Sequence, residues 1–217
     1  MSKTDVIIVS LLLSCHVLYG EEGMIIKLPP PKQKGNITLE EAISKRRSER
    51  NLESKTLSLE TIGQLLWACQ GITDSRRNLR AAPSAGATYP LEIYLVKNDG
   101  LFHYIPEGHK LEKIKDGDLR GELCDACLGQ GFVRDADIDF VICADFKRTT
   151  SRYGKRGEMY VYIEAGHAAQ NLHLQAVSEG LGSVPVGAFS EIAVKNVLGL
   201  SPGLIPVYII PVGHIKD

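Results

Sequence analysis

The sequence is poor in aromatic residues and carries almost no net charge. Among its 217 residues, Phe, Trp and Tyr make up 6%, and the formal net charge at pH 7 is −1. This balance gives no support for a nucleic-acid partner, which would call for a basic surface or aromatic rings on which bases stack. Hydrophobic residues make up 44% of the chain, which is enough for the core of one well-filled domain.

Familiar nucleotide-binding and catalytic motifs are also missing. The chain contains neither the G-x-G-x-x-G loop of dinucleotide-binding folds nor the G-x-x-x-x-G-K loop of NTPases. It also lacks the G-x-S-x-G turn that presents a nucleophilic serine. The sequence therefore offers no side-chain nucleophile and no standard phosphate loop.

Cysteine is too scarce for a disulfide framework in a chain of this length, since only five are present. Cys69 lies in a helical pattern and Cys143 in a strand pattern, so both are expected to be small core residues. Cys124 and Cys127 form a single C-x-x-C, which is either a redox pair or half of a zinc site. Because no second C-x-x-C or H-x-x-x-H lies nearby, we predict no metal.

The first 36 residues differ from the rest of the chain. Residues 6–20 are apolar but too short for a standard membrane span. They fit the core of an export signal, a lipid-anchor signal ending at Cys15, or an apolar arm packed on the body. The location of the protein therefore stays open between exported, membrane-anchored and cytoplasmic. Residues 27–36 hold three consecutive prolines and predict an extended linker. The domain itself is expected over residues 37–217.

The remaining pattern alternates irregularly between helices and strands. Thr38, with Glu41 three residues later, predicts a capped helix that continues through residue 50, and Ser58 caps a second that ends at Gly71. We then expect a hairpin at 91–105 around "NDG", a helix with a mobile loop at 106–133, a buried strand at 138–146 and a polar loop at 149–157. After these we expect a long helix at about 158–179, a short strand and turn at 181–189, a helix at 190–199 and a strand at 204–213. This is an α+β pattern.

The long helix is rich in small residues, among them Ala165, Gly166, Ala168 and Ala169. Small residues allow another helix to approach closely, so this helix either packs tightly in the core or meets its counterpart in a second copy of the chain. Glu164 and His167 are three residues apart and could share a metal. We instead expect His167 to make an ordinary polar contact.

Four segments carry side chains or bare backbone suited to a ligand. "KRRSER" at 45–50 offers arginines for phosphate, or it is a solvated helix end. "RAAPSAGATYP" at 80–90 has small residues that can lie against a flat ring or a phosphate, or it simply connects into a strand. "GSVPVGAF" at 182–189 can present free amides, and "PVGHIKD" at 211–217 places His214 and Lys216 after a strand.

The order of these segments resembles the FMN-dependent nitroreductase superfamily. "PSAGATYPLEIY" and "YIEAGHAAQNL" are most similar to its SagB-type dehydrogenase branch, which includes thiazole/oxazole oxidases. The resemblance covers about residues 37–216. It implies a nitroreductase-like fold, with a central, mostly antiparallel sheet flanked by helices. It also implies a homodimer with FMN at the interface.

The same resemblance implies roles for individual residues. The FMN phosphate, ribityl chain and pyrimidine edge would be bound by Arg46, Arg47, Ser48 and Arg50, with His214 near the phosphate. The ring would be lined from the partner subunit by Pro83, Ser84, Ala85 and Gly86. Its other face would be covered by Pro185, Val186, Gly187 and Ala188, with the Gly187 or Ala188 amide reaching flavin N5.

The sequence departs from the family pattern in three places. Gly187 stands where many nitroreductases have Glu, and Ala87 with Thr88 stands where classical members have Asn near the ring. The chain reaches Asp217 without the classical Lys/Arg pair on the phosphate, so Arg80 or Lys216 is expected to replace it. These departures leave the substrate and the use of NAD(P)H open.

The resemblance predicts an oxidoreductase that works by ping-pong hydride transfer through flavin N5. The branch also suggests dehydrogenation of a peptide azoline to an azole. Tyr153, Lys155 and Tyr160 are then candidates to move the proton. The alternatives are a flavin-binding or storage protein without turnover, and a module that has lost the cofactor.

Overall fold

The computed structural model describes residues 23–216. The apolar segment at 6–20, for which we predicted a signal, an anchor or a packed arm, lies outside these residues. Within them, no helix is both long enough and apolar enough to cross a bilayer.

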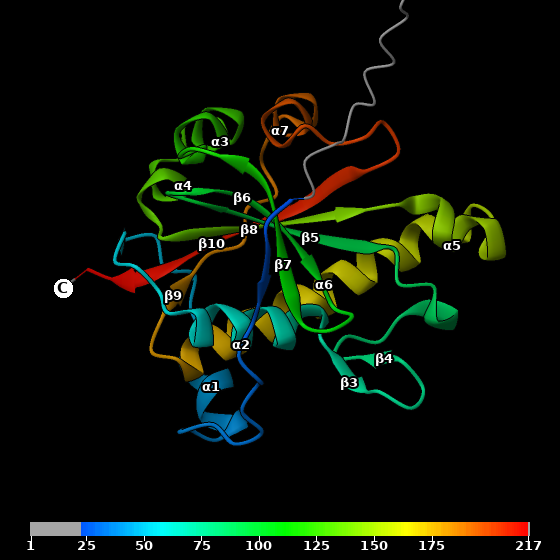
Figure 1. Ribbon diagram of the computed structural model, residues 1–217, viewed down its shortest axis with the longest axis horizontal. Helices are drawn as coiled ribbons and strands as arrows, with labels where there is room; N and C mark the ends of the chain where they lie inside the picture. The colour runs from blue at the N-terminus through cyan, green and yellow to red at the C-terminus, as the bar shows by residue number, and fades with distance from the viewer. Residues whose placement is uncertain (1–22, 217) are drawn as a thin grey trace, which may run out of the picture.

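A single antiparallel sheet forms the centre of the molecule (Figure 1). Its path across the sheet is β1 (Ile25–Lys27), β7 (Lys110–Asp116), β6 (Gly100–Ile105), β5 (Leu91–Lys97), β8 (Ile138–Ala144), β10 (Ile205–Ile215) and β2 (Leu52–Glu53), with β9 (Gly182–Ser183) paired to β10. A separate small sheet joins β3 (Ile72–Asp74) and β4 (Leu79–Arg80). The predicted α+β class with a mostly antiparallel sheet is confirmed.

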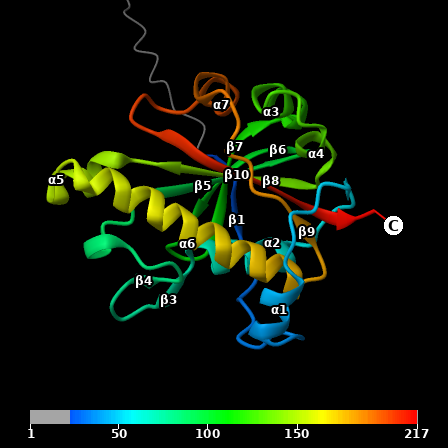
Figure 2. The same cartoon turned by 180° about the vertical axis from the view of Figure 1, so that it is seen from behind.

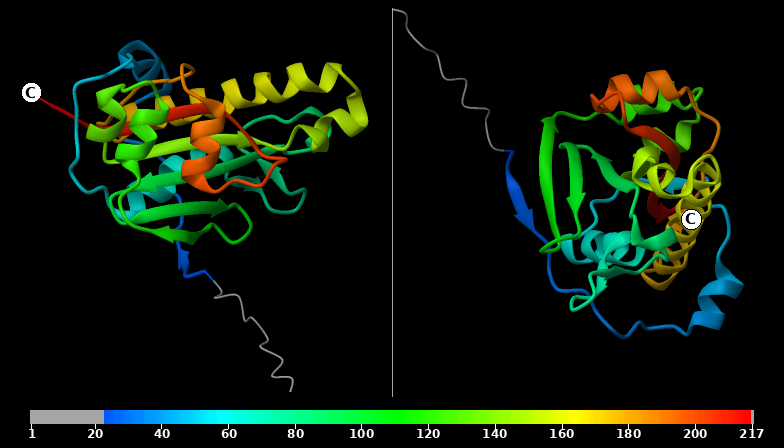
Figure 3. Two further views of the ribbon diagram at one scale, coloured as in Figure 1. Left: turned by 90° about the horizontal axis from the view of Figure 1, so that it is seen from above. Right: turned by 90° about the vertical axis from the view of Figure 1, so that its right-hand side faces the viewer.

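Helices cover both faces of the sheet, as Figures 1 and 2 show. One face carries α2 (Leu59–Gln70) and the long α6 (Arg156–Ser178), to which α1 (Leu39–Lys45) is attached. The other face carries α3 (Arg120–Ala126), α4 (Gly131–Asp135) and α7 (Glu191–Leu198). Beyond one end of the sheet project α5 (Phe146–Tyr153) and the start of α6 (Figure 3).

A hydrophobic core lies on each face of the sheet, and the central strand β8 contributes side chains to both. Every residue of "IDFVICA" is buried. Ile138, Phe140 and Ile142 face the α2 and α6 side, whereas Val141 and Cys143 face the α3, α4 and α7 side. A strand buried on both faces reads as a nearly continuous apolar run because alternate side chains enter different cores.

Short-range capping signals were reliable in this chain. The Thr38 hydroxyl accepts a hydrogen bond from the Glu41 N–H at 3.1 Å, and the Ser58 hydroxyl accepts one from Thr61 at 3.2 Å. However, α1 ends at Lys45, so the prediction that it continues to residue 50 is wrong. The backbone leaves the helix there because Ser48 forms a bridge with Ser183 of β9.

The predicted polar loop at 149–157 is also wrong. These residues form the end of α5 and the start of α6, with a break at Gly154, whose φ is +56°. Asp145 starts α5 by accepting a hydrogen bond from the Lys147 N–H at 3.0 Å. The charged residues here mark a solvent-exposed helix.

The segment 106–133 contains more structure than the predicted helix and mobile loop. It holds the strand β7 and two short helices, α3 and the start of α4. β7 has the charged sequence "KLEKIKD", and only Leu111 of it is buried. A strand near the sheet edge with one solvated face carries too few apolar residues for a clear strand signal.

The proline-rich segment is extended, as predicted, and lies on the body. Leu28 is buried in the α2 and α6 core. The Lys32 N–H donates to the Gln64 side-chain carbonyl at 2.8 Å, and the Gln64 amide returns a bond to the Lys32 carbonyl at 3.2 Å. These bonds fix the arm against α2.

Candidate active site

Three of the four predicted ligand segments meet at one end of the sheet, beside the C-terminus in Figure 1. Ser48 forms its bridge with Ser183, and the Glu49 N–H donates to the Ser183 carbonyl at 3.0 Å. A few residues further on, β2 pairs with the end of β10, which places His214 opposite Glu53. The structure thus brings together residues 46–50, the β9 loop and His214.

The three arginines of this segment have different surroundings. The Arg47 guanidinium donates to the carbonyls of Ser44 and Arg46 at 2.9 and 2.7 Å, so it is tied to the end of α1. Arg50 lies over the Phe132 ring, 5.9 Å from its centroid. Across residues 23–216, none of the three forms a salt bridge with a carboxylate. Their positive charge is therefore available to an anion.

His173 of α6 contacts β9, the strand with which the arginine segment pairs. It is 4% exposed, and its Nδ1 lies 2.8 Å from the Ser183 hydroxyl. Burial, together with the nearby charge of Arg46, lowers the pKa of His173 to about 4, so the ring is neutral near pH 7. It acts as a polar support for β9, a role that its spacing in the sequence did not reveal.

The loop after β9 is held rigidly but exposes its tip. Val186 donates to and accepts from Ile209 at 2.8 and 3.1 Å, and the Ala188 carbonyl accepts from the Gln130 amide at 2.9 Å. Gly187 is exposed, and a Cβ added there would meet nothing within 4 Å. In the described part of the chain, the N–H groups of Gly187 and Ala188 donate no hydrogen bond. Pro185 and Val186 thus lead to two free amides.

The remaining segment, residues 80–90, contains the Pro83–Gly86 loop and lies away from the other three. The loop follows β4 and runs into the 3-10 turn η1 (Ala85–Ala87), near α5 and far from β9 in Figure 2. The Arg152 guanidinium donates to the Gly86 carbonyl at 3.3 Å. Gly86 has φ +61°, and a Cβ there would lie 2.5 Å from the Tyr153 hydroxyl. Within one chain, this loop and the arginine segment therefore lie at opposite ends of the molecule.

The candidate proton-transfer residues lie near the Pro83–Gly86 loop. The rings of Tyr153 and Tyr160 pack edge to face with centroids 5.3 Å apart. Lys155 is exposed immediately before α6. The two tyrosines and the small-residue loop thus form one neighbourhood, since Tyr160 lines a cavity together with Pro83, Ser84 and Ala85.

The two proposed replacements for the classical Lys/Arg pair are separated. The Lys216 N–H donates to the Asn51 carbonyl at 2.9 Å, which keeps that residue beside the arginine segment. Arg80 instead donates to the Gln70 side chain at 3.2 Å and lies 4.6 Å from the Tyr89 ring centroid. Arg80 thus belongs to the neighbourhood of the Pro83–Gly86 loop.

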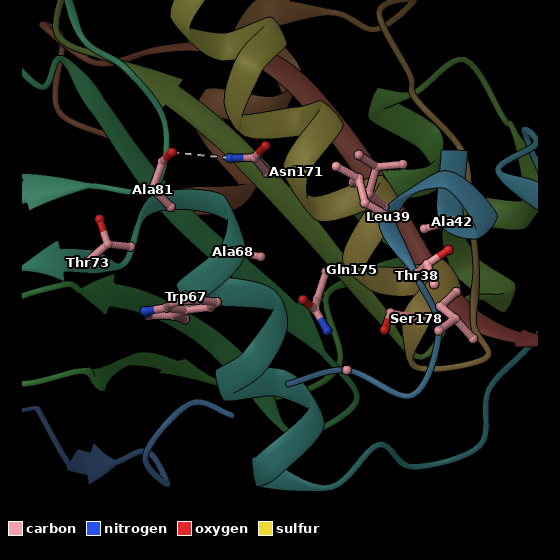
Figure 4. A pocket seen from close by; sticks show the side chains of 13 residues that line it. Thr38, Leu39, Ala42, Trp67, Ala68, Thr73, Ala81, Asn171, Gln175 and Ser178 are labelled. Atoms are coloured by element: carbon pink, nitrogen blue, oxygen red, sulfur yellow. Dashed lines mark hydrogen bonds between the residues drawn. The ribbon is translucent and has the colours of Figure 1, made fainter. Parts of the chain in front are cut away.

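A cavity of about 410 Å³ lies between α1, α2 and α6 around Trp67 and Asn171, and none of the predicted site residues lines it (Figure 4). A cavity of about 260 Å³ adjoins Arg47, Glu49 and Ser183. Another, of about 270 Å³, is lined by Pro83, Ser84, Ala85, Tyr160, Ile163, Glu164 and His167. The cavity of about 270 Å³ is thus lined by Pro83, Ser84 and Ala85 of the predicted site, whereas Arg47 is the one predicted cofactor-binding residue at the cavity of about 260 Å³.

Cys69 and Cys143 are buried, as expected. Cys124 and Cys127 are also buried, and the Cys124 thiol donates to the Gln130 carbonyl at 3.4 Å. Between residues 23 and 216, no three His, Cys, Asp or Glu side chains gather as a metal site.

The chain belongs to the nitroreductase family, whose model matches residues 43–214. It is an oxidoreductase of a family that is generally flavin-dependent. A nitroreductase-family protein of Methanocaldococcus jannaschii, MJ1384, is 42% identical to it over 89% of this chain and 98% of that protein.

Two other relatives extend the comparison. A nitroreductase-family crystal structure from Ralstonia eutropha superposes with a TM-score of 0.82 at 29% identity, over 91% of this chain and 92% of the other. The microcin B17-processing protein McbC of Escherichia coli is 25% identical over 76% of this chain and 65% of McbC. The similarity to McbC agrees with the SagB-like branch.

Proposed function

We propose that this protein is an FMN-dependent oxidoreductase that transfers hydride in a ping-pong cycle. The observation that carries the proposal is the meeting of residues 46–50 with the loop after β9. Arginines without a carboxylate partner in residues 23–216 lie on a segment that pairs with β9, and the loop that follows β9 carries two free amides. Arginine suits phosphate recognition, and free amides suit a ring nitrogen that carries charge.

When bound, FMN supplies hydride transfer at N5. In this proposal Arg46, Ser48 and Arg50 hold the phosphate and the neighbouring ribityl chain, and Arg47 fixes the end of α1 through its two carbonyl contacts. His214 lies next to this segment through the β2–β10 pairing. The Gly187 and Ala188 amides orient the reacting edge of the ring.

We further propose that the active unit is a homodimer. Pro83 to Ala85 cannot reach the arginine segment of their own chain, so they would line the ring held by a second copy. The exposed side of α6 supports this arrangement because Met159, Tyr162 and Ile163 are 39%, 57% and 46% exposed. A contiguous apolar strip of this kind marks an interaction surface.

Ile163→Asp is expected to convert the dimer to a monomer and to lower flavin occupancy at the same time. A carboxylate placed in a desolvated interface costs several kcal/mol. Light scattering would report the mass, and absorbance would report the flavin. Ile192→Asp on α7, where Ile192 is 73% exposed, is the matched control. A monomer that keeps its full flavin content would contradict the shared site.

The similarity to McbC favours a second candidate activity. McbC is named for processing microcin B17, so we propose a peptide azoline as an alternative substrate, oxidised to an azole. Tyr153, Lys155 and Tyr160 are the proposed proton-transfer groups. Cyclised peptide offered to the oxidised holoenzyme would lose mass corresponding to two hydrogens if this activity is present.

The absorbance spectrum of the purified protein, before and after anaerobic NADPH, tests the main proposal. We expect flavin bands that bleach, because NADPH would pass its hydride to the flavin. Bands that persist would point to storage or to another donor, and the latter also fits export through residues 6–20. No bands, even after FMN is added, would contradict the proposal.

A further inference from the structure

A buried polar cluster lies next to the Pro83–Gly86 loop. Glu164 of α6 is 2% exposed and Gln70 of α2 is fully buried, while the Arg80 side chain is 11% exposed. The Arg80 guanidinium donates to the side-chain oxygen of Gln70, Oε1, at 3.2 Å. Three elements thus bring polar side chains into the interior next to Ser84.

This cluster is incompletely hydrogen-bonded. Within the described chain, Glu164 Oε1, Gln70 Nε2 and Arg80 Nε are buried without a well-formed hydrogen bond, although the Ser84 and Gln70 side chains lie close enough to the carboxyl to lower its pKa. An unsatisfied buried polar group costs about 1–3 kcal/mol, so a cluster that is paired this incompletely needs an explanation.

Glu164 also lines a cavity. Together with Ser84, Tyr160 and His167 it borders the space of about 270 Å³ beneath the small-residue loop. The other charged group at this carboxyl is Arg80, which itself lies 3.6 Å from Glu107. Tyr160 and His167 are the titratable groups on the cavity wall. The carboxyl is therefore buried but borders a space that a ligand can enter.

Burial raises the pKa of Glu164 to about 7, and nearby Ser84, Gln70 and Arg80 offset only part of this effect. The ordinary value for a glutamate is about 4.3. A proton donor works best when its pKa lies near the working pH, and such values gather at functional sites. Tyr160 and His167 contribute to the same wall but are less buried.

We infer that Glu164 is the proton donor to the electron acceptor bound in this cavity. The inference rests on the proposed function, in which the Pro83–Gly86 loop lines the flavin held by the partner. Two-electron reduction of a quinone needs a hydride, which comes from the reduced flavin, and a proton. The Glu164 O–H bond breaks, the proton goes to a quinone oxygen, and the carboxylate regains a proton from water.

Glu164→Gln tests this role because the amide keeps the size and hydrogen-bonding capacity of the acid but carries no transferable proton. Holoenzyme would be reduced with dithionite and mixed with p-benzoquinone over a range of pH. In the wild type, reoxidation should slow as pH rises through about 7, where Glu164 loses its proton. In the variant it should be about 100-fold slower at pH 6 and independent of pH, with flavin content unchanged.

A measurement that needs no turnover accompanies the kinetics. Carbon-13 NMR of protein labelled at the glutamate carboxyl should show one signal that titrates near pH 7 and that disappears in Glu164→Gln. Asp139→Asn is the matched control, since Asp139 is also fully buried with both oxygens unpaired among the described residues, but on the opposite face of the sheet. It should keep the wild-type pH profile.

The outcomes separate the two proposals. A flavin-loaded Glu164→Gln that reoxidises at the wild-type rate with the wild-type pH profile overturns the role of Glu164 and leaves the flavin proposal standing. A carboxyl signal that titrates at an ordinary glutamate pKa overturns it as well, even if the variant does not fold. If the wild type itself takes up no flavin, the proposed function fails, and the proton-donor role falls with it.

Discussion

The double variant Arg46→Ala/Arg50→Ala is expected to lose its flavin and to remain folded. In the proposed site these arginines bind the phosphate, and hydrogen bonds to charged groups contribute about 1.5–3 kcal/mol each. Removing both should weaken FMN binding by roughly 100- to 10,000-fold. The fold should survive because neither arginine forms a salt bridge in residues 23–216. Titration of the apoprotein with FMN, followed by fluorescence, measures the loss.

Two single variants serve as controls. Arg134→Ala removes an exposed arginine whose one salt bridge among the described residues is to its neighbour Asp135, so FMN affinity should not change. Arg47→Ala removes the two bonds to the carbonyls of Ser44 and Arg46, so it should loosen the end of α1 more than it weakens phosphate binding. Unchanged FMN affinity in the double variant would contradict the phosphate assignment.

The sequence predicted best where the determining contacts are local. Thr38 and Ser58 cap helices through residues three positions away, and the "NDG" turn closes the hairpin between β5 and β6. The nearly continuous apolar run of residues 138–144 predicts the buried strand β8. In each case, the residues that decide the structure lie within one short window, so no knowledge of the fold was needed.

The errors occur where distant contacts decide. Residues 46–50 continue a helical pattern, but their backbone pairs with β9, more than 130 positions away in the chain. α5 projects beyond the sheet and buries only Thr149, so it lacks the apolar face on which helix prediction depends. β7 is charged because one of its faces is solvated.

The candidate site shows the same division. Arginines, small residues and glycines could be picked out from their types, because phosphate and flat rings demand those types. Glu164 could not be recognised as a proton donor, since its spacing with His167 suggested only a weak metal pair. What distinguishes it is burial beside Ser84 and Gln70, and burial is a property of the folded chain.

Gly187→Val is expected to prevent the flavin from seating while leaving the stability of the protein unchanged. Nothing in the described chain lies within 4 Å of a Cβ at this position, so the fold itself does not require glycine there. In the proposed site the isopropyl group would occupy the space between the free amide and the ring. Loss of that contact and of close approach should weaken FMN binding by roughly 10- to 100-fold. Thermal unfolding and FMN titration together measure both halves of this expectation.

Gly203→Val is the matched control, because Gly203 is also exposed and free of neighbours within 4 Å but lies in the loop before β10, outside the proposed site. Gly187→Ala should fall between the wild type and Gly187→Val, since a methyl group fills less of the same space. If the valine variant is as yellow and as readily reduced as the wild type, the amide of Gly187 does not face the ring. The free Ala188 amide would then be the next candidate on this loop, because the Val186 N–H is already bonded to Ile209.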